Sequence, residues 1–199
     1  MNVSMSGNND IQHAMLIVSD AESFHNLAKK ALPRGSYMTV DSCKSAAGAR
    51  RCILERYYDM IVINAPLPDE PGIELAQLAA DQSNASVLII VSADLYSDAM
   101  ARVTDLGVMV MAKPFPKAML GYAIRYMAAR QTKLRRLEIK LSATQERMEE
   151  LRTVSKAKVL LVEKKKMTED EAHHYIGKLA MDRGMSRKYI ADVIIELLS

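Results

Sequence analysis

A chain of 199 residues has room for one domain or two small ones, since domains commonly run to roughly 100 to 150 residues. With 49% hydrophobic and 26% charged residues, its composition is that of a globular protein, which excludes a fibrous chain and a wholly disordered one. The net charge of +3 is unevenly distributed along the chain. Residues 1–116 hold 9 Lys and Arg against 13 Asp and Glu, whereas residues 117–199 hold 18 Lys and Arg against 11 Asp and Glu. The basic surplus of residues 117–199 is compatible with an anionic partner.

Short apolar runs alternate with amphipathic stretches up to residue 113, as parallel strands alternate with crossover helices. The expected strands are residues 14–19, 37–41, 60–64, 87–92 and 108–112, and the last three are apolar enough to be buried on both faces. The sequence therefore predicts an α/β domain with a doubly wound, five-stranded parallel sheet in residues 13–116, after a disordered tail of residues 1–12.

Small polar or charged residues stand where these strands end. They are Ser19 and Asp20 after the first strand, Asn64 after the third, Ser92 after the fourth and Lys113 after the fifth. In doubly wound sheets, binding sites lie outside the carboxyl ends of the strands. We therefore predict that these residues share one pocket.

Residues 117–152 contain neither Gly nor Pro apart from Gly121, and they fit one long helix. One column of a heptad repeat is wholly apolar and its companion column is mixed. We expect residues 117–150 to form either the linker of a dimeric coiled coil or a connector packed against its own chain. The dimer contacts would be Leu120, Met127, Leu134, Leu137, Leu141, Met148 and Leu151.

The remaining residues predict a small all-α domain of three helices in residues 151–199. Its first helix runs from about residue 149 to 163, and Thr168 with Glu171 forms a capping-box pattern that begins the second. Gly184 can end that helix, and Ser186 can cap the third. Each helix has an apolar face, and three such faces close a minimal core.

The loop after Asn64 and the residues after two later strands form a specific motif. Pro68 and Gly72 follow Asn64 by four and eight positions, Ser92 follows the fourth strand, and Lys113-Pro114 follows the fifth. On this motif, residues 13–128 resemble the receiver domain of two-component response regulators. The resemblance implies a flavodoxin-like fold, in which the lysine contacts a phosphoryl group on a strand-end aspartate and the proline is commonly cis.

Three positions depart from a working receiver. Asn64 replaces the aspartate nucleophile, the acidic pair is reduced to Ser19-Asp20, and Val110 stands at the aromatic switch position. An amide cannot form an acyl phosphate and adds no negative charge for Mg²⁺. We therefore predict a pseudo-receiver that is not phosphorylated at Asn64 and that responds to a regulatory protein or ligand. The alternative is residual metal or anion sensing by Asp20, Ser92 and Lys113.

Residues 145–199 resemble the ANTAR RNA-binding domain of transcription antitermination regulators. The resemblance lies in Ala157-Lys158, in residues 167–172 and 179–183, and in Ile190-Ala191, while Val159 replaces the family's usual Gly. It implies a dimer that binds hairpins in nascent mRNA leaders and so prevents a terminator from forming. The predicted RNA contacts are Lys158, Arg183, Arg187, Lys164, Lys165, Lys188, Ala180 and Met181. The alternatives are solvated surface charges for the basic residues and core positions for the Ala-Met pair.

No catalytic arrangement, cofactor motif or metal motif is visible, so we expect a protein that is not an enzyme. The adjacent His173 and His174 diverge by about 100° on a helix and cannot both face one ion. The cysteines, Cys43 and Cys52, match no disulfide framework, and no segment reads as a signal peptide or membrane helix, which predicts a cytoplasmic protein. The rival functions are a DNA-binding response regulator, disfavoured because no recognition helix follows residue 199, and a signalling adaptor that binds no nucleic acid.

Overall fold

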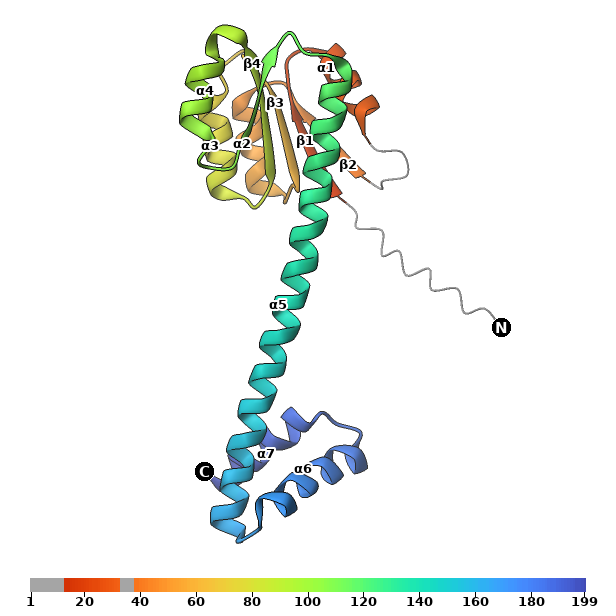
Figure 1. Ribbon diagram of the computed structural model, residues 1–199, viewed down its shortest axis with the longest axis vertical. Helices are drawn as coiled ribbons and strands as arrows, with labels where there is room; N and C mark the ends of the chain where they lie inside the picture. The colour runs from red at the N-terminus through yellow and green to blue at the C-terminus, as the bar shows by residue number, and fades with distance from the viewer. Residues whose placement is uncertain (1–12, 33–37) are drawn as a thin grey trace, which may run out of the picture. The chain divides into compact units, whose positions relative to one another are not determined.

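The computed structural model describes residues 13–32 and 38–199, which form two compact units that divide after Arg135 (Figure 1). The predicted disordered tail, residues 1–12, and the first residue of the predicted second strand, Tyr37, lie outside the described residues. Each unit is a separate body with its own buried core. The long helix α5 (Lys117–Lys165) contributes residues to both cores.

The first unit contains a five-stranded parallel sheet in the order β2-β1-β3-β4-β5. The strands are β1 (His13–Val18), β2 (Met38–Cys43), β3 (Met60–Asn64), β4 (Ser86–Ser92) and β5 (Met109–Lys113). The predicted fold class is confirmed, the bounds of β3 are as predicted, and the ends of the other strands differ from the predicted ones by at most two residues. The expectation of full burial is wrong for β5, where only Met111 is buried, because β5 lies at the edge of the sheet.

Helices cover both faces of the sheet, each with its own apolar core. On one face the core includes residues of α2 (Ala46–Glu55), α3 (Ile73–Gln82) and α4 (Tyr96–Val103). On the other face, residues of α1 (Glu22–Ala31) and the beginning of α5 pack together, as Figure 1 shows. The thiol sulfurs of Cys43 and Cys52 lie 3.1 Å apart where β2 meets α2, a proximity that their spacing in the sequence did not predict.

Helix α5 contains 49 residues, and no break separates the predicted linker from the first helix of the tail. Its first turns belong to the sheet domain, where Leu120 is 0% exposed and Met127 is 2% exposed. The prediction that these two residues form dimer contacts is therefore wrong, since their side chains are already buried against the sheet. Further along, Leu134 is half-buried and the apolar column becomes exposed.

The second unit consists of the end of α5 with α6 (Glu169–Arg183) and α7 (Arg187–Leu198). The predicted capping box is present, because the Thr168 hydroxyl accepts from the backbone of Glu171 while the Glu171 carboxylate accepts from the backbone of Thr168. Gly184 ends α6 in the left-handed conformation, with φ of 62°. The core of this unit consists of Ala157, Leu161, Ala172, Ile176, Ala180, Ile190, Ala191 and Ile194.

Two glycines of the sheet domain should respond oppositely to alanine. Gly72 has φ of +91°, and a Cβ there would lie 3.2 Å from the Cβ of Ala65, so Gly72→Ala should destabilise the domain by about 2 kcal/mol. Gly121 lies within α5, where the nearest atom to a new Cβ is the Ala31 carbonyl oxygen at 4.0 Å, so Gly121→Ala should stabilise it by about 0.5–1 kcal/mol. Urea unfolding followed by circular dichroism measures the free energy of unfolding of both variants. Equal changes in that free energy would contradict the prediction that Gly72 requires glycine and Gly121 does not.

Candidate functional sites

At the carboxyl end of β3, Asn64 is held by a hydrogen bond to Ser19. The Asn64 side-chain amide donates to the Ser19 hydroxyl oxygen at 2.9 Å, and that oxygen also accepts from the backbone of Ala21 at 3.1 Å. Both residues are buried, Ser19 completely. Neutral groups therefore satisfy each other at the strand ends where the receiver resemblance would require carboxylates.

Lys113 reaches across the end of the sheet from β5, and its ammonium group donates to the Ala65 carbonyl oxygen at 2.5 Å. Burial lowers the pKa of Lys113, and the charge of the exposed Asp20 acts in the opposite direction. The peptide bond before Pro114 is cis, as the receiver resemblance implies. The lysine thus lies beside the loop that follows Asn64, in the position the motif predicted for it.

Ser92 is paired in the sheet with Lys113, which places the ends of β4 and β5 side by side. A hydrogen bond with the Ser92 side chain lowers the pKa of Asp94, the second residue after the strand. The structure therefore brings Ser19 and Asn64 into direct contact, with Lys113 close to them. Across residues 13–32 and 38–199, no group of three or more His, Cys, Asp or Glu residues is placed to hold a metal ion.

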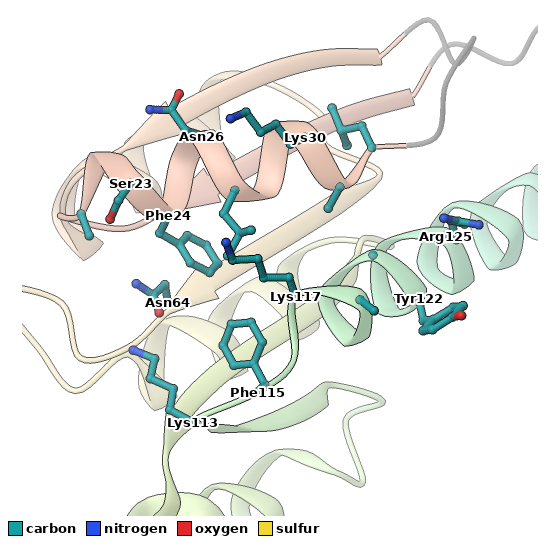
Figure 2. Close-up of a pocket in the computed structure, with 16 residues that line it drawn as sticks. Ser23, Phe24, Asn26, Lys30, Asn64, Lys113, Phe115, Lys117, Tyr122 and Arg125 are labelled. Carbon is teal, nitrogen blue, oxygen red and sulfur yellow. The ribbon is translucent and has the colours of Figure 1, made fainter.

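A large groove opens beside Asn64 and Lys113 and continues between α1 and α5 (Figure 2). Its volume is about 1180 Å³. The sequence analysis missed this groove, because its walls come from helices that lie about 90 residues apart in the chain. It is lined by Ala21, Ser23, Phe24, Asn26, Leu27, Lys30, Ala31, Leu32, Asn64, Lys113, Phe115, Lys117, Ala118, Gly121, Tyr122 and Arg125.

The second half of α5 exposes the remaining predicted dimer contacts. The side chains of Leu137, Leu141, Met148 and Leu151 are between 51% and 63% exposed. They recur at heptad spacing on a helix whose other exposed residues are mostly polar. Within residues 13–32 and 38–199 of the single chain, this stripe of four residues remains an uncovered apolar surface.

The predicted RNA contacts of the tail fall into three groups. Arg183, Arg187, Lys164 and Lys165 are exposed, and so is Met181, at 81%. Ala180 is buried in the core of the three-helix unit, so its prediction as an RNA contact is wrong, since no loop base can reach it. Lys158 and Lys188 are engaged in ion pairs.

The ion pair of Lys158 crosses between two helices of the tail. Its ammonium group donates to the Glu169 carboxylate at 2.7 Å, and only 21% of the Lys158 side chain is exposed. This contact lowers the pKa of Glu169. A cavity of about 310 Å³ adjoins the pair and is lined by Ser155, Lys158, Val159, Val162, Glu163 and Glu169. Lys188 is similarly paired with Glu149 at 3.1 Å.

The fold and the sheet-end residues define a receiver-type regulator with an α-helical output domain, and comparisons with known proteins agree. The family model of the response regulator receiver domain matches residues 15–125, and that of the ANTAR domain matches residues 142–195. The transcriptional regulatory protein PdtaR of Mycobacterium tuberculosis is 32% identical over 141 residues, covering 70% of this chain and 68% of the relative. The chain therefore belongs to the response regulators that combine a receiver domain with an ANTAR domain.

Solved structures support the fold of the first unit. A CheY-like receiver domain protein from Methanospirillum hungatei JF-1 superposes with a TM-score of 0.54 at 21% identity, covering 61% of this chain and 98% of that one. The signal receiver domain of an HD domain-containing protein from Pseudomonas fluorescens Pf-5 gives a TM-score of 0.53 at 20% identity, covering 62% and 92%. In the part of the chain that the structure describes, no helix is both long and apolar enough to cross a membrane.

Proposed function

We propose that this chain is a transcription antitermination regulator that binds hairpins in nascent mRNA leaders and keeps a terminator from forming. The match of residues 142–195 to the ANTAR domain carries the proposal. The exposed Arg183 and Arg187 flank the turn between α6 and α7, and Met181 in the last turns of α6 is exposed as well. Basic side chains that neutralise phosphates and apolar side chains beside splayed bases are what RNA loops require. The role is one of binding, without catalysis.

We further propose that the active form is a homodimer joined through the exposed stripe of α5. An isolated helix with four exposed apolar residues at heptad spacing gains stability when a second copy covers them. Two tails held together would bind two hairpins of one leader, and linking two sites raises the overall affinity without any new contact. These arguments favour the coiled coil over a connector that packs against its own chain.

Binding to RNA is tested with the purified chain and a pair of hairpins from the leader of a neighbouring operon. We expect the hairpin pair to bind more tightly than either a duplex DNA of equal length or a single-stranded RNA with scrambled sequence. A salt titration accompanies each measurement, because affinities for nucleic acids are comparable only at a stated salt concentration. Equal affinity for duplex DNA would favour a DNA-binding regulator, and no binding to any nucleic acid would favour an adaptor.

Incubation with a small-molecule phosphodonor and Mg²⁺ should leave the mass of the protein unchanged. Asn64 has no carboxylate nucleophile, and its amide is already hydrogen-bonded to Ser19. Intact-mass spectrometry checks this expectation, with a receiver that carries the strand-end aspartate as the positive control. An acid-labile, Mg²⁺-dependent phosphoryl adduct in the first unit would show that the domain is not a pseudo-receiver.

A further inference from the structure

The groove between α1 and α5 is strongly basic, although the unit that contains it is nearly neutral in net charge. Lys30, Lys113, Lys117 and Arg125 line it, and among the described residues no carboxylate does. Residues 1–135, the unit that contains the groove, carry 14 Lys and Arg against 13 Asp and Glu. Cations concentrated in one groove of a nearly neutral unit create a local positive potential that attracts anions.

The basic side chains of the groove form no ion pair with a carboxylate among the described residues, although the charge of the exposed Asp20 acts on Lys113. In the part of the chain that the structure describes, none of the four makes an ion pair within 4.0 Å. Lys117 lies in the first turn of α5, and this turn contains no acidic residue. A cation in the first turn is unfavourable for a helix, so this lysine does not stabilise α5. Its placement beside the groove is therefore better explained by a ligand than by the fold.

The groove also presents aromatic rings. Phe24 and Phe115 both line the groove (Figure 2), where Phe24 is 7% exposed and packs in the core while Phe115 is half-buried and leaves part of its ring open. On α5 itself, the Arg125 guanidinium lies 5.8 Å from the centroid of the Tyr122 ring, and Tyr122 is 68% exposed. Planar ligands stack on such rings and on arginine. Ser23, Asn26 and Asn64 add hydrogen-bonding groups along the same walls.

We propose that this groove binds a nucleotide, with its phosphates at the basic side chains and its base against the aromatic rings. Several cations within one site suit a group that carries more than one negative charge, and a single carboxylate would leave most of them unpaired. The volume of about 1180 Å³ is ample, since small-molecule pockets commonly measure about 300–1,000 Å³. This site is independent of the RNA-binding role proposed for the tail.

The test is isothermal titration calorimetry of the full chain with the common ribonucleoside mono-, di- and triphosphates. We expect at least one to bind once per chain with a Kd below about 100 μM, and the matching nucleoside and inorganic phosphate to bind at least tenfold more weakly. Failure of every nucleotide to bind below about 1 mM would overturn the proposal. Equal binding of inorganic phosphate would also overturn it, because the rings would then have no role.

Paired variants locate the site. Lys117→Ala with Arg125→Ala should weaken nucleotide binding at least tenfold, whereas Lys29→Ala with Lys133→Ala should leave it unchanged. The control pair removes the same charge at exposed positions of α1 and α5 that lie outside the groove, whereas both residues of the test pair belong to α5. Circular dichroism confirms that both variants fold. Unchanged binding in the first variant, or an equal loss in both, would place the nucleotide elsewhere and overturn the proposal.

Discussion

Replacement of Leu141 and Met148 by lysine should convert the protein from a dimer into a monomer. The two side chains are 59% and 51% exposed in the single chain, so the variant should keep its fold. In a coiled-coil dimer four such side chains would be buried, each contributing at least about 1.5 kcal/mol. The loss of about 6 kcal/mol corresponds to roughly four powers of ten in the dimer Kd. Light scattering coupled to size-exclusion chromatography at micromolar concentration measures the change.

The matched control for the dimer is Ile139→Lys with Ser142→Lys, which adds the same charge to the same part of α5. Both positions are exposed and lie outside the two heptad columns. The control should remain dimeric and should bind the hairpin pair as the parent does, whereas the stripe variant should lose the gain from double binding. A monomeric parent, or a control that also dissociates, would contradict the proposed dimer.

Glu169→Gln should strengthen the binding of hairpin RNA, and Lys158→Ala should weaken it. Lys158 is predicted as a phosphate contact, yet its ammonium group is held by the Glu169 carboxylate at 2.7 Å. RNA must compete with that carboxylate, and glutamine removes the competing charge. If Lys158 neutralises one phosphate, its loss should lower the salt slope by about 0.7. Salt titrations of hairpin binding measure both variants, and Lys156→Ala serves as a control on the same helix.

The double variant separates this competition from a general change in charge. When Lys158 is absent, Glu169→Gln should have little further effect, so the double variant should behave like Lys158→Ala alone. Additive effects would show that Glu169 repels RNA without involving Lys158. Unchanged affinity and salt slope in a folded Lys158→Ala variant would remove this lysine from the RNA site.

The same ion pair gives the tail a pH dependence with a defined sign. Lys158 holds the pKa of Glu169 below its ordinary value of 4.5. The pair therefore contributes stability that is fully present above pH 4.5 and is lost as the pH falls through the lower folded-state pKa. Thermal unfolding of the parent should lose this contribution on acidification, whereas that of Glu169→Gln should not. The effect is small, because the carboxylate is 78% exposed.

Local patterns predicted the fold well because each depends on neighbouring residues. Alternating apolar runs indicated the strands, and Thr168 with Glu171 and Gly184 marked both ends of α6. The apolar column of α5 was less informative, since Leu120 and Leu141 occupy equivalent heptad positions although one packs on the sheet and the other is exposed. Periodicity shows which residues share a helix face, and it does not show what covers that face.

The candidate sites were predictable only where a motif fixes them. Their positions after the fourth and fifth strands located Ser92 and Lys113, and sheet register then placed Ser92 beside Lys113. The hydrogen bond between Asn64 and Ser19 and the ion pair between Lys158 and Glu169 could be seen only in the structure. Ala180 was misassigned because a small residue on an amphipathic helix is compatible with either face, and the packing of the three helices of the tail buries it.

Because α5 is one unbroken helix, the number of residues in its middle section determines the direction in which every later side chain points. Met127 packs against the sheet. Leu141 lies two heptads later in the same column, and in the proposed dimer it faces the second copy of the chain. Each residue inserted into or deleted from an α-helix rotates everything beyond it by about 100°. A single deletion at residue 136, just after the sheet domain ends, would therefore leave the residues of both cores in place while turning the stripe by about 100° around the axis of α5. Relatives that differ in length here should do so by whole heptads.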